Sequence, residues 1–303
     1  MNTQSSRVRF TDGFAVASDV IIVSSHLVEQ IDANLSRIFT MKGSKWFFFD
    51  LEARISSLCL VERPIRGVYG LGLNGVLHVT RSGQTLTQTE RVIPPGPERA
   101  KLGFVTKIRE IAGTLYVCGM SGQIYQRGAS TWVPIDDGVV DPRGAPKALD
   151  LYCIDGTSEN DIYAVGQQGL VWHRTNKSWN RINVTDQNVN WVRCVSPDEV
   201  YLACTGGTFF RGHGDHWEDF SVPKMQQSFE CVEAFKGRIY LATLSGLYSF
   251  DGKKVSPVDT GLNPVPDGNH LHAKDGVLWS FGPNHICFFD GKKWTYLKHP
   301  DNP

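Results

Sequence analysis

Asp161-Ile162-Tyr163-Ala164-Val165-Gly166-Gln167-Gln168-Gly169 is the stretch that decides the fold, and it runs on into Leu170-Val171-Trp172-His173. Its two apolar runs are rich in residues that favour β-strands, and a Gly-Gln-Gln-Gly segment separates them. Glycine supplies the positive φ that a tight connection needs, and it lets two backbones approach closely. The stretch therefore predicts a β-hairpin.

The same motif recurs along the chain. Each copy starts at an aromatic residue, has glycine or a small residue three positions later, and usually has glycine three positions after that. The copies start at Tyr69, Tyr116, Tyr163, Tyr201, Tyr240 and Trp279. Successive spacings are 47, 47, 38, 39 and 39 residues. Ile21 lies 48 residues before Tyr69 and takes this place in a degenerate first copy without the glycines. A fixed period of this length indicates a repeat architecture.

Each hairpin is flanked by one further strand on either side. The strand after the hairpin often follows an Asp-Gly turn, and its apolar markers are Trp46, Leu86, Trp132, Trp179, Trp217, Val255 and Trp294. The strand before the hairpin is a short apolar stretch such as Trp191–Cys194. We name the four strands of a unit A to D. Four antiparallel strands repeated radially form a propeller blade.

The prediction is an all-β fold: a single seven-bladed β-propeller of four-stranded antiparallel blades that spans residues 1–303. The expected blades cover residues 13–50, 55–93, 103–135, 148–183, 190–222, 228–259 and 269–297. We expect the ring to close by packing of blade seven on blade one, aided by Arg7 to Phe10. Because outer-strand tryptophans such as Trp179 recur at the repeat spacing, we expect them to pack between blades.

The unit Asp161–Gly169 followed by Ser178-Trp179, and the stretch Asp290-Gly291-Lys292-Lys293-Trp294-Thr295, resemble the BNR-like, or degenerate Asp-box, repeat of bacterial propellers. The resemblance covers nearly the whole chain and is specific for the fold. The turns mostly lack the Ser or Thr that stands two residues before the Asp of a full Asp-box. Propellers of this sort include small intracellular partners of toxins, so the resemblance implies a protein-binding role with toxin immunity as its sharpest form. Fold-level likeness does not by itself assign an activity.

Composition narrows the function classes. The chain has 31 Lys plus Arg and 31 Asp plus Glu, and this balance argues against a nucleic-acid partner, which needs a basic stripe. The apolar run Val20 to Val23 is far too short to span a membrane, and we expect no membrane partner. Seven cysteines without a CxxC pair predict reduced thiols in a cytoplasmic protein. Cys59, Cys153, Cys194 and Cys231 fall on different A strands, where packing is the expected role and a metal or redox cluster the alternative.

The D-to-A connections vary most in length, and variable loops on a rigid scaffold are where binding usually sits. We therefore expect another protein to bind there, through charged loops and through residues at the starts of A strands. The predicted partner-binding residues are Asp136, Asp137, Asp141, Arg143, Lys147, Trp191, Lys224, Asp267 and His270. For Trp191, simple burial between blades is an equal alternative.

Several other patterns suggest a different site. The acidic loop from Asp136 to Asp150 suggests Ca²⁺, but its spacing is not that of an EF-hand and Pro142 interrupts it. His213, Asp215 and His216 suggest zinc, but they fall at a C-to-D turn. His270 and His272 alternate on an A strand, so both face the same side and are candidates for the central channel. No metal and no cofactor are predicted.

An enzyme is the main alternative class. Related propellers include sialidases, which clamp a carboxylate with three arginines, and Arg193, Arg109 and Arg54 are the candidates on inner strands. The chain shows no Gly-x-Ser-x-Gly elbow and no phosphate-binding loop. We therefore expect a non-enzymatic, protein-binding propeller that acts as a cytoplasmic immunity protein. A carbohydrate-binding or carbohydrate-cleaving propeller and an assembly scaffold are the alternatives.

Overall fold

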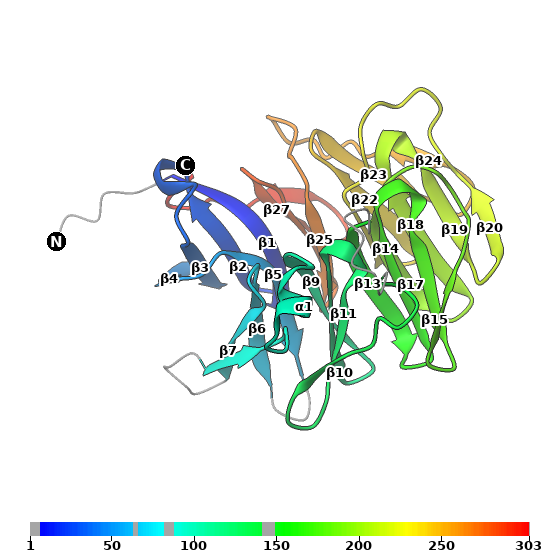
Figure 1. Cartoon of the computed structure of the whole chain (residues 1–303). Helices are drawn as coiled ribbons and strands as arrows, with labels where there is room; N and C mark the ends of the chain where they lie inside the picture. The colour runs from blue at the N-terminus through cyan, green and yellow to red at the C-terminus, as the bar shows by residue number, and fades with distance from the viewer. Residues whose placement is uncertain (1–6, 63–65, 82–87, 141–148, 303) are drawn as a thin grey trace. The chain divides into compact units, whose positions relative to one another are not determined.

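The computed structural model describes residues 7–62, 66–81, 88–140 and 149–302. Its strands form seven separate four-stranded antiparallel sheets, and this is the predicted seven-bladed β-propeller (Figure 1). Helix within the described residues is limited to α1 (Pro97–Ala100) and four single 3₁₀ turns. No helix in this part of the chain has the length and apolar character that a membrane crossing requires.

The chain divides into two compact units, Met1–Leu58 with Glu230–Pro303 and Cys59–Phe229. The first unit holds blade 1 (β1 Val8–Ala17, β2 Val20–Leu27, β3 Ser36–Lys42, β4 Lys45–Leu51), blade 6 (β21 Cys231–Phe235, β22 Arg238–Thr243, β23 Gly246–Phe250, β24 Val255–Pro257) and blade 7 (β25 His270–Lys274, β26 Val277–Phe281, β27 Ile286–Phe289, β28 Trp294–Tyr296).

The second unit holds the other four blades, apart from residues 55–58 at the start of β5, which belong to the first unit. They are blade 2 (β5 Ile55–Val61, β6 Gly67–Gly72, β7 Val76–Arg81, β8 Gln88–Arg91), blade 3 (β9 Val105–Ile111, β10 Thr114–Gly119, β11 Ile124–Arg127, β12 Trp132–Pro134), blade 4 (β13 Leu151–Ser158, β14 Asp161–Gly166, β15 Val171–Thr175, β16 Ser178–Arg181) and blade 5 (β17 Val189–Ser196, β18 Glu199–Cys204, β19 Phe209–His213, β20 His216–Asp219).

Glycine at the predicted hairpin positions answers a steric need. A Cβ atom at Gly169 would lie 1.7 Å from the carbonyl oxygen of Thr185, and the backbone there has φ +69°. Only glycine fits such an approach without moving the chain. The contact joins the B-to-C turn of blade 4 to the connection that leads from blade 4 to blade 5. Because Gly169 has no Cβ atom, the D-to-A connection can pack directly against the B-to-C turn of its blade.

The core of each unit lies between adjacent blades. One cluster of the second unit joins Ile111, Tyr116 and Ile124 of blade 3 to Ile154, Ile162 and Trp179 of blade 4. Trp179 is buried, and its Nε1 donates to the carbonyl oxygen of Ile135 at 2.6 Å. This confirms the prediction that an outer-strand tryptophan packs between blades. Leu86, the expected marker of blade 2, lies outside the described residues.

Blade 7 and blade 1 pack directly against each other within the first unit, as predicted. Blade 7 is built from its own four strands, and β1 contacts β25 and β26. Phe10 donates its backbone N–H to the carbonyl oxygen of Pro283 at 3.0 Å. The side chain of Asn302 bonds both backbone groups of Val8, at 3.2 Å and 2.8 Å. Blade 1 begins at Val8 rather than at residue 13, because these additional contacts extend its first strand.

Candidate functional site

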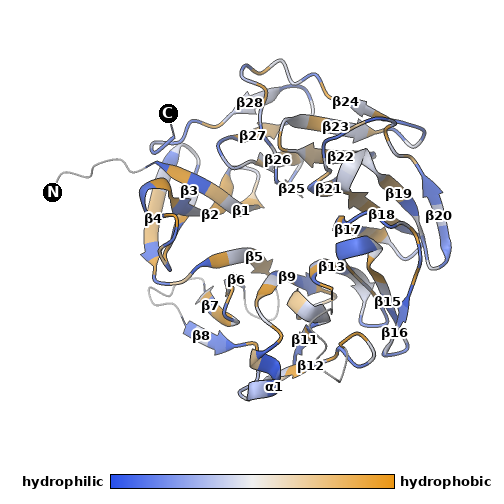
Figure 2. Ribbon diagram, turned by 45° about the horizontal axis from the view of Figure 1, so that its top comes forward, coloured by the Kyte–Doolittle hydropathy of each residue, from blue (hydrophilic) through white to orange (hydrophobic). Residues whose placement is uncertain are grey.

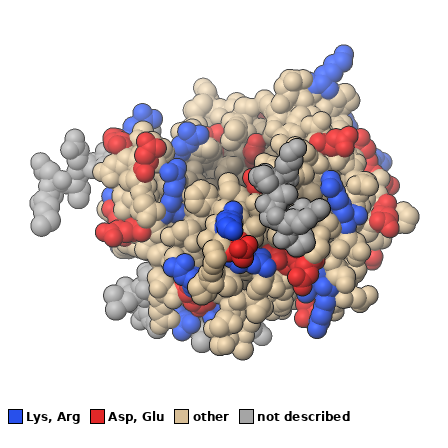
Figure 3. All heavy atoms as spheres, in the orientation of Figure 1, with Lys and Arg blue, Asp and Glu red and all other residues tan. Residues whose placement is uncertain are grey.

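The B-to-C turns and the D-to-A connections lie at the same end of every blade, and we call this the D-to-A end. The predicted binding residues Asp137 and Lys224 are exposed there. Lys224 has φ +65°, so a tight turn presents its side chain. Asp141, Arg143 and Lys147 lie outside the described residues. On the face shown in Figure 3, acidic and basic side chains are interspersed, in agreement with the balanced composition.

Asp136 is not on the surface, and its burial corrects the prediction that it contacts a partner. It is 2% exposed. Arg99 bonds both carboxylate oxygens, at 2.5 Å and 3.0 Å, and Ile124 donates its backbone N–H to Oδ2 at 3.1 Å. Arg99 lies in α1, in the connection before blade 3, and Asp136 lies in the connection after blade 3. Their ion pair therefore joins these two connections. A buried carboxylate with this many donors is structural.

Asp267 has a similar role and is corrected in the same way. It is buried and accepts hydrogen bonds from the backbone N–H groups of Asn284 and His285, both at 3.0 Å. The side chains of the same two residues also reach it, at 2.7 Å and 2.8 Å. Asp267 thereby holds the turn between β26 and β27 beneath the connection that enters blade 7.

His270 and His272 are engaged with blade 1 rather than presented to a partner. His270 is buried and forms an ion pair with Asp12 of β1. Asp12 in turn accepts the backbone N–H of Leu58 at 2.9 Å. The Nδ1 atom of His272 accepts the N–H of Ala15 at 3.2 Å. The choice of His270 as a binding anchor is therefore corrected: its side chain joins the inner strands of blades 7 and 1.

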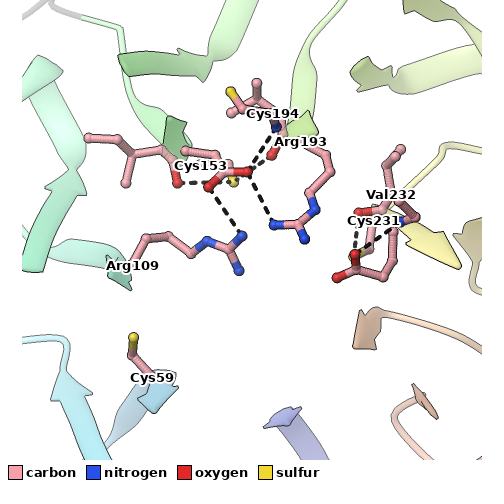
Figure 4. Close-up of polar contacts among 12 residues, drawn as sticks. Cys59, Arg109, Cys153, Arg193, Cys194, Cys231 and Val232 are labelled. Atoms are coloured by element: carbon pink, nitrogen blue, oxygen red, sulfur yellow. Dashed lines mark hydrogen bonds and ion pairs between the residues drawn. The ribbon is translucent and has the colours of Figure 1, made fainter. Parts of the chain in front are cut away.

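The inner strands of blades 3, 4 and 5 meet at Asp155, a buried residue of β13. Arg109 of β9 and Arg193 of β17 both point toward its carboxylate, with N–O distances of 3.2 Å and 3.5 Å (Figure 4). The backbone N–H of Cys194 completes the site at 2.9 Å. Sequence reasoning proposed these arginines as clamps for a substrate carboxylate. The carboxylate that they hold belongs to the protein itself.

Trp191 lies beside this cluster and is buried, so the structural alternative for this residue holds. The ammonium group of Lys107 lies 4.4 Å from the centroid of the Trp191 ring. Such a cation–π contact stabilises a buried lysine by roughly 0.5–2 kcal/mol. Trp191 thus packs between inner strands, and a partner does not reach its ring in this arrangement.

The A-strand cysteines pack in the core, as predicted. All seven cysteines are free and buried. Burial raises the pKa of the Cys153 and Cys194 thiols and raises that of Cys59 to about 12. A protonated, buried thiol is a poor nucleophile and a poor metal ligand. Among the described residues, no group of three His, Cys, Asp or Glu side chains has the arrangement of a metal site.

The stretch from His213 to His216 is a C-to-D hairpin turn, as predicted. Gly214 at its tip has φ +50°, and its N–H donates to the hydroxyl of Tyr163 at 2.9 Å. Trp217 closes the turn by donating Nε1 to the Gly214 carbonyl at 2.8 Å. The histidines flank this turn as partners of the β19–β20 ladder.

Exposed apolar side chains at the D-to-A end are what sequence reasoning missed. In the first unit, Leu244 is 56% exposed in the B-to-C turn of blade 6, and Val265 is 62% exposed in the connection that follows. Val28 and Ile31 are exposed in the B-to-C connection of blade 1, and in the second unit Phe104 precedes β9. The available signal was an apolar residue inside a turn, such as Val265 between two prolines. Exposed apolar side chains in the connections at this end of the blades favour contact with another protein.

A pocket of about 620 Å³ lies between the outer strands of blades 2 and 3. Two of its charged groups bond each other: Arg127 reaches the two carboxylate oxygens of Glu90 at 2.9 Å and 2.8 Å. Trp132 donates Nε1 to the same carboxylate at 3.3 Å. Glu90, Arg127 and Trp132 are therefore engaged with one another inside this pocket.

Seven blades of four antiparallel strands each define a seven-bladed β-propeller protein. The solved structures that it resembles include the WD40 β-propeller domain of Doa1, with TM-score 0.71, 11% identity and 95% of each chain covered. YCF48 from Cyanidioschyzon merolae is similar with TM-score 0.64 and 12% identity, over 98% of this chain and 97% of that one. At such identities the likeness shows the fold alone.

No family model matches the sequence. The immune protein Tsi7 of Pseudomonas aeruginosa is 31% identical to it over 246 residues, which are 80% of this chain and 79% of Tsi7. The chain belongs to the family of the immune protein Tsi7.

Proposed function

We propose that this chain is a non-enzymatic immunity protein that binds a partner toxin and neutralises it. The observation that carries the proposal is its 31% identity to an immune protein over four-fifths of its length. Seven free, buried cysteines suit a reducing compartment, and we place the protein in the cytoplasm. In the hairpin turns of blades 6 and 7, Asp251 and Asp290 each accept two backbone N–H groups, which supports a BNR-like repeat.

We place the toxin at the D-to-A end. Leu244 and Val265 supply apolar contact area in the first unit, and Phe104 supplies it in the second. Asp137 and Lys224 are exposed charges in connections of the second unit. Buried apolar contacts set the lifetime of a complex, whereas charges at its rim mainly set the association rate and the salt dependence.

The test is affinity capture from the native host, followed by calorimetry with the captured toxin and a growth assay in cells that express it. We expect the double variant Leu244→Asp/Val265→Asp to weaken binding at least about tenfold and to lose protection. Val195→Asp is the control, because Val195 is also apolar and exposed, at 41%, but lies near the end of β17, opposite the D-to-A end. If the folded double variant binds the toxin as tightly as the parent, the binding site lies elsewhere on the protein. If the parent protects cells against no toxin, the proposed function is wrong.

A further inference from the structure

The outer strand of blade 1 differs from every other described outer strand. The D strands β8, β12, β16, β20, β24 and β28 have three or four residues each. β4 has seven. Short outer strands limit the row of backbone groups that another chain can pair with, and natural sheets use this device to prevent association at their edges. Blade 1 does not use it.

The side chains of β4 increase the difference. Phe47, Phe48 and Phe49 are 57%, 53% and 42% exposed. In the β16 and β20 strands the exposed positions carry Ser, Asn, Arg, His, Glu and Asp instead. Figure 2 shows β4 in the orange of apolar residues and β20 in blue. Three adjacent exposed phenylalanines form the kind of apolar patch that marks an interaction site.

Both sides of β4 contribute to this patch, because successive side chains of a strand point to opposite faces. On one face Phe48 lies against Phe39, with ring centroids 5.8 Å apart, and below the guanidinium of Arg37 at 4.2 Å. On the other face Phe47 and Phe49 lie opposite Thr40 and Ile38 of β3. Within the described strands β4 pairs with β3 alone, so its second edge presents backbone donors and acceptors.

The charges around β4 are arranged with opposite signs at its two ends. Lys45 begins the strand beside Lys42, the last residue of β3, and Asp50 and Glu52 stand at its end; all four are exposed. Asp50 is already paired with Arg37 of β3 at 2.7 Å, so Glu52 supplies the negative charge at that end that is unpaired within the described residues. Two copies of this strand laid antiparallel would bring the basic end of each against the acidic end of the other. Two copies laid parallel would bring like charges together. Opposite charges across a strand pair stabilise it, and like charges destabilise it.

We propose that β4 is the dimerisation edge of this protein, and that its occupant is β4 of a second copy of the same chain. The two strands pair antiparallel about a two-fold axis that passes near Phe48. This arrangement places Phe47 of each copy near Phe49 of the other, on one face of a continuous eight-stranded sheet. A two-fold interface of this kind uses the same patch on both subunits. The inference stands apart from toxin binding, because β4 is not part of the D-to-A end.

The first experiment measures the mass of the full chain in solution by sedimentation equilibrium over a range of concentrations. We expect a reversible dimer. The variant Phe47→Ser/Phe49→Ser should raise the dissociation constant at least tenfold, with an unchanged circular dichroism spectrum. The matched control Leu244→Ser/Val265→Ser removes two exposed apolar side chains elsewhere and should leave the dimer intact. A parent chain that stays monomeric at every concentration overturns the proposal.

A charge exchange tests whether the partner strand is an identical copy. Lys45→Glu places an acidic residue against Glu52 of the other copy at both ends of the pair, and Glu52→Lys places a basic residue against Lys45 of the other copy. Each single variant should therefore dimerise more weakly than the parent. An equimolar mixture of the two should dimerise more strongly than either alone, because both ends of the mixed pair then carry opposite charges. A mixture no stronger than its components overturns the antiparallel arrangement.

The toxin assay keeps the two proposals separate. The Phe47→Ser/Phe49→Ser variant should bind and neutralise the toxin as the parent does. If this variant stays folded and has the same mass in solution as the parent but no longer binds the toxin, β4 is a toxin contact and the dimer proposal is wrong. If the parent dimerises but protects against no toxin, the proposed function fails and the dimer edge stands.

Discussion

Blades 4 and 1 share one strand order and differ in almost everything else. The strands of blade 4 have eight, six, five and four residues, shortening toward a polar outer strand. Those of blade 1 have ten, eight, seven and seven residues, and the outer strand is apolar and exposed. Blade 4 carries the full glycine motif at Gly166 and Gly169, which blade 1 lacks.

The comparison of the two blades distinguishes residues that the propeller fold requires from residues that it does not require. In blade 4 the motif residues meet a steric or packing demand, as Gly169 does beneath Thr185 and Trp179 does between blades. In blade 1 no such demand explains the length of β4 or its three exposed phenylalanines. Residues that depart from the repeat and do not stabilise the fold are candidates for an interaction site.

Removal of the blade 4 tryptophan should have the largest effect on stability. Trp179→Ala leaves a cavity between blades 3 and 4 and an unpaired carbonyl at Ile135, and we expect a loss of about 3–5 kcal/mol. Trp46→Ala in blade 1 is the matched change. Trp46 is only partly buried, although its Nε1 donates to the Lys298 carbonyl at 3.2 Å, so its removal should cost less than half as much. Urea denaturation with tryptophan-independent detection measures both, and equal losses would refute the distinction.

The second prediction concerns pH and is specific to blade 1. His299 is buried against Phe10, Phe39 and Trp46, with ring centroids 5.0, 4.4 and 4.4 Å away. Its Nδ1 accepts the N–H of Asp301 at 3.1 Å, a bond that protonation of this nitrogen would break. Burial lowers the pKa of His299 to about 4, from 6.5 in the unfolded chain.

Because the unfolded chain binds this proton first as pH falls, stability is complete above pH 6.5 and declines toward pH 4. The contribution lost is about 3 kcal/mol. Unfolding free energies measured between pH 7.5 and 4.5 should show this slope in the parent, and a smaller slope in His299→Gln. An identical slope in the two proteins would show that His299 does not carry it. Burial also lowers the pKa of His26, so part of the slope remains in the variant.

The repeat made the fold predictable, because strand, turn and glycine positions are local properties of the sequence. The roles of Asp136 and His270 were not predictable. Arg99 lies 37 residues from Asp136, and Asp12 lies 258 residues from His270, so neither pairing leaves a local pattern. Without its partner each residue resembles an exposed charge. The exposed β4 was missed for the opposite reason: a run of phenylalanines in a strand normally indicates burial.

The third prediction compares two glycines with positive φ. Gly169→Ala in blade 4 forces a Cβ atom to within 1.7 Å of the Thr185 carbonyl oxygen, so the connection must move, and we expect a loss of about 2–3 kcal/mol. Gly43→Ala in blade 1 has φ +59° but meets nothing within 4 Å. It should cost only about 1 kcal/mol, from backbone conformation alone. Urea denaturation distinguishes the two, and similar values would mean that the blade 4 connection yields easily.

The smallest effect is expected where blade 1 departs furthest from the repeat. Phe47→Ser removes a side chain that is 57% exposed, and the stability of the monomer should change by no more than about 0.5 kcal/mol. Phe39→Ser, on the paired strand of the same blade, removes a buried ring and should cost about 3 kcal/mol or more. The measurement is denaturation at the lowest workable protein concentration, so that association contributes little. If Phe47→Ser is nearly neutral there, the fold of the single chain does not require this phenylalanine, and its contribution lies in contact with another chain. A large loss would instead make the phenylalanines of β4 part of the core of blade 1.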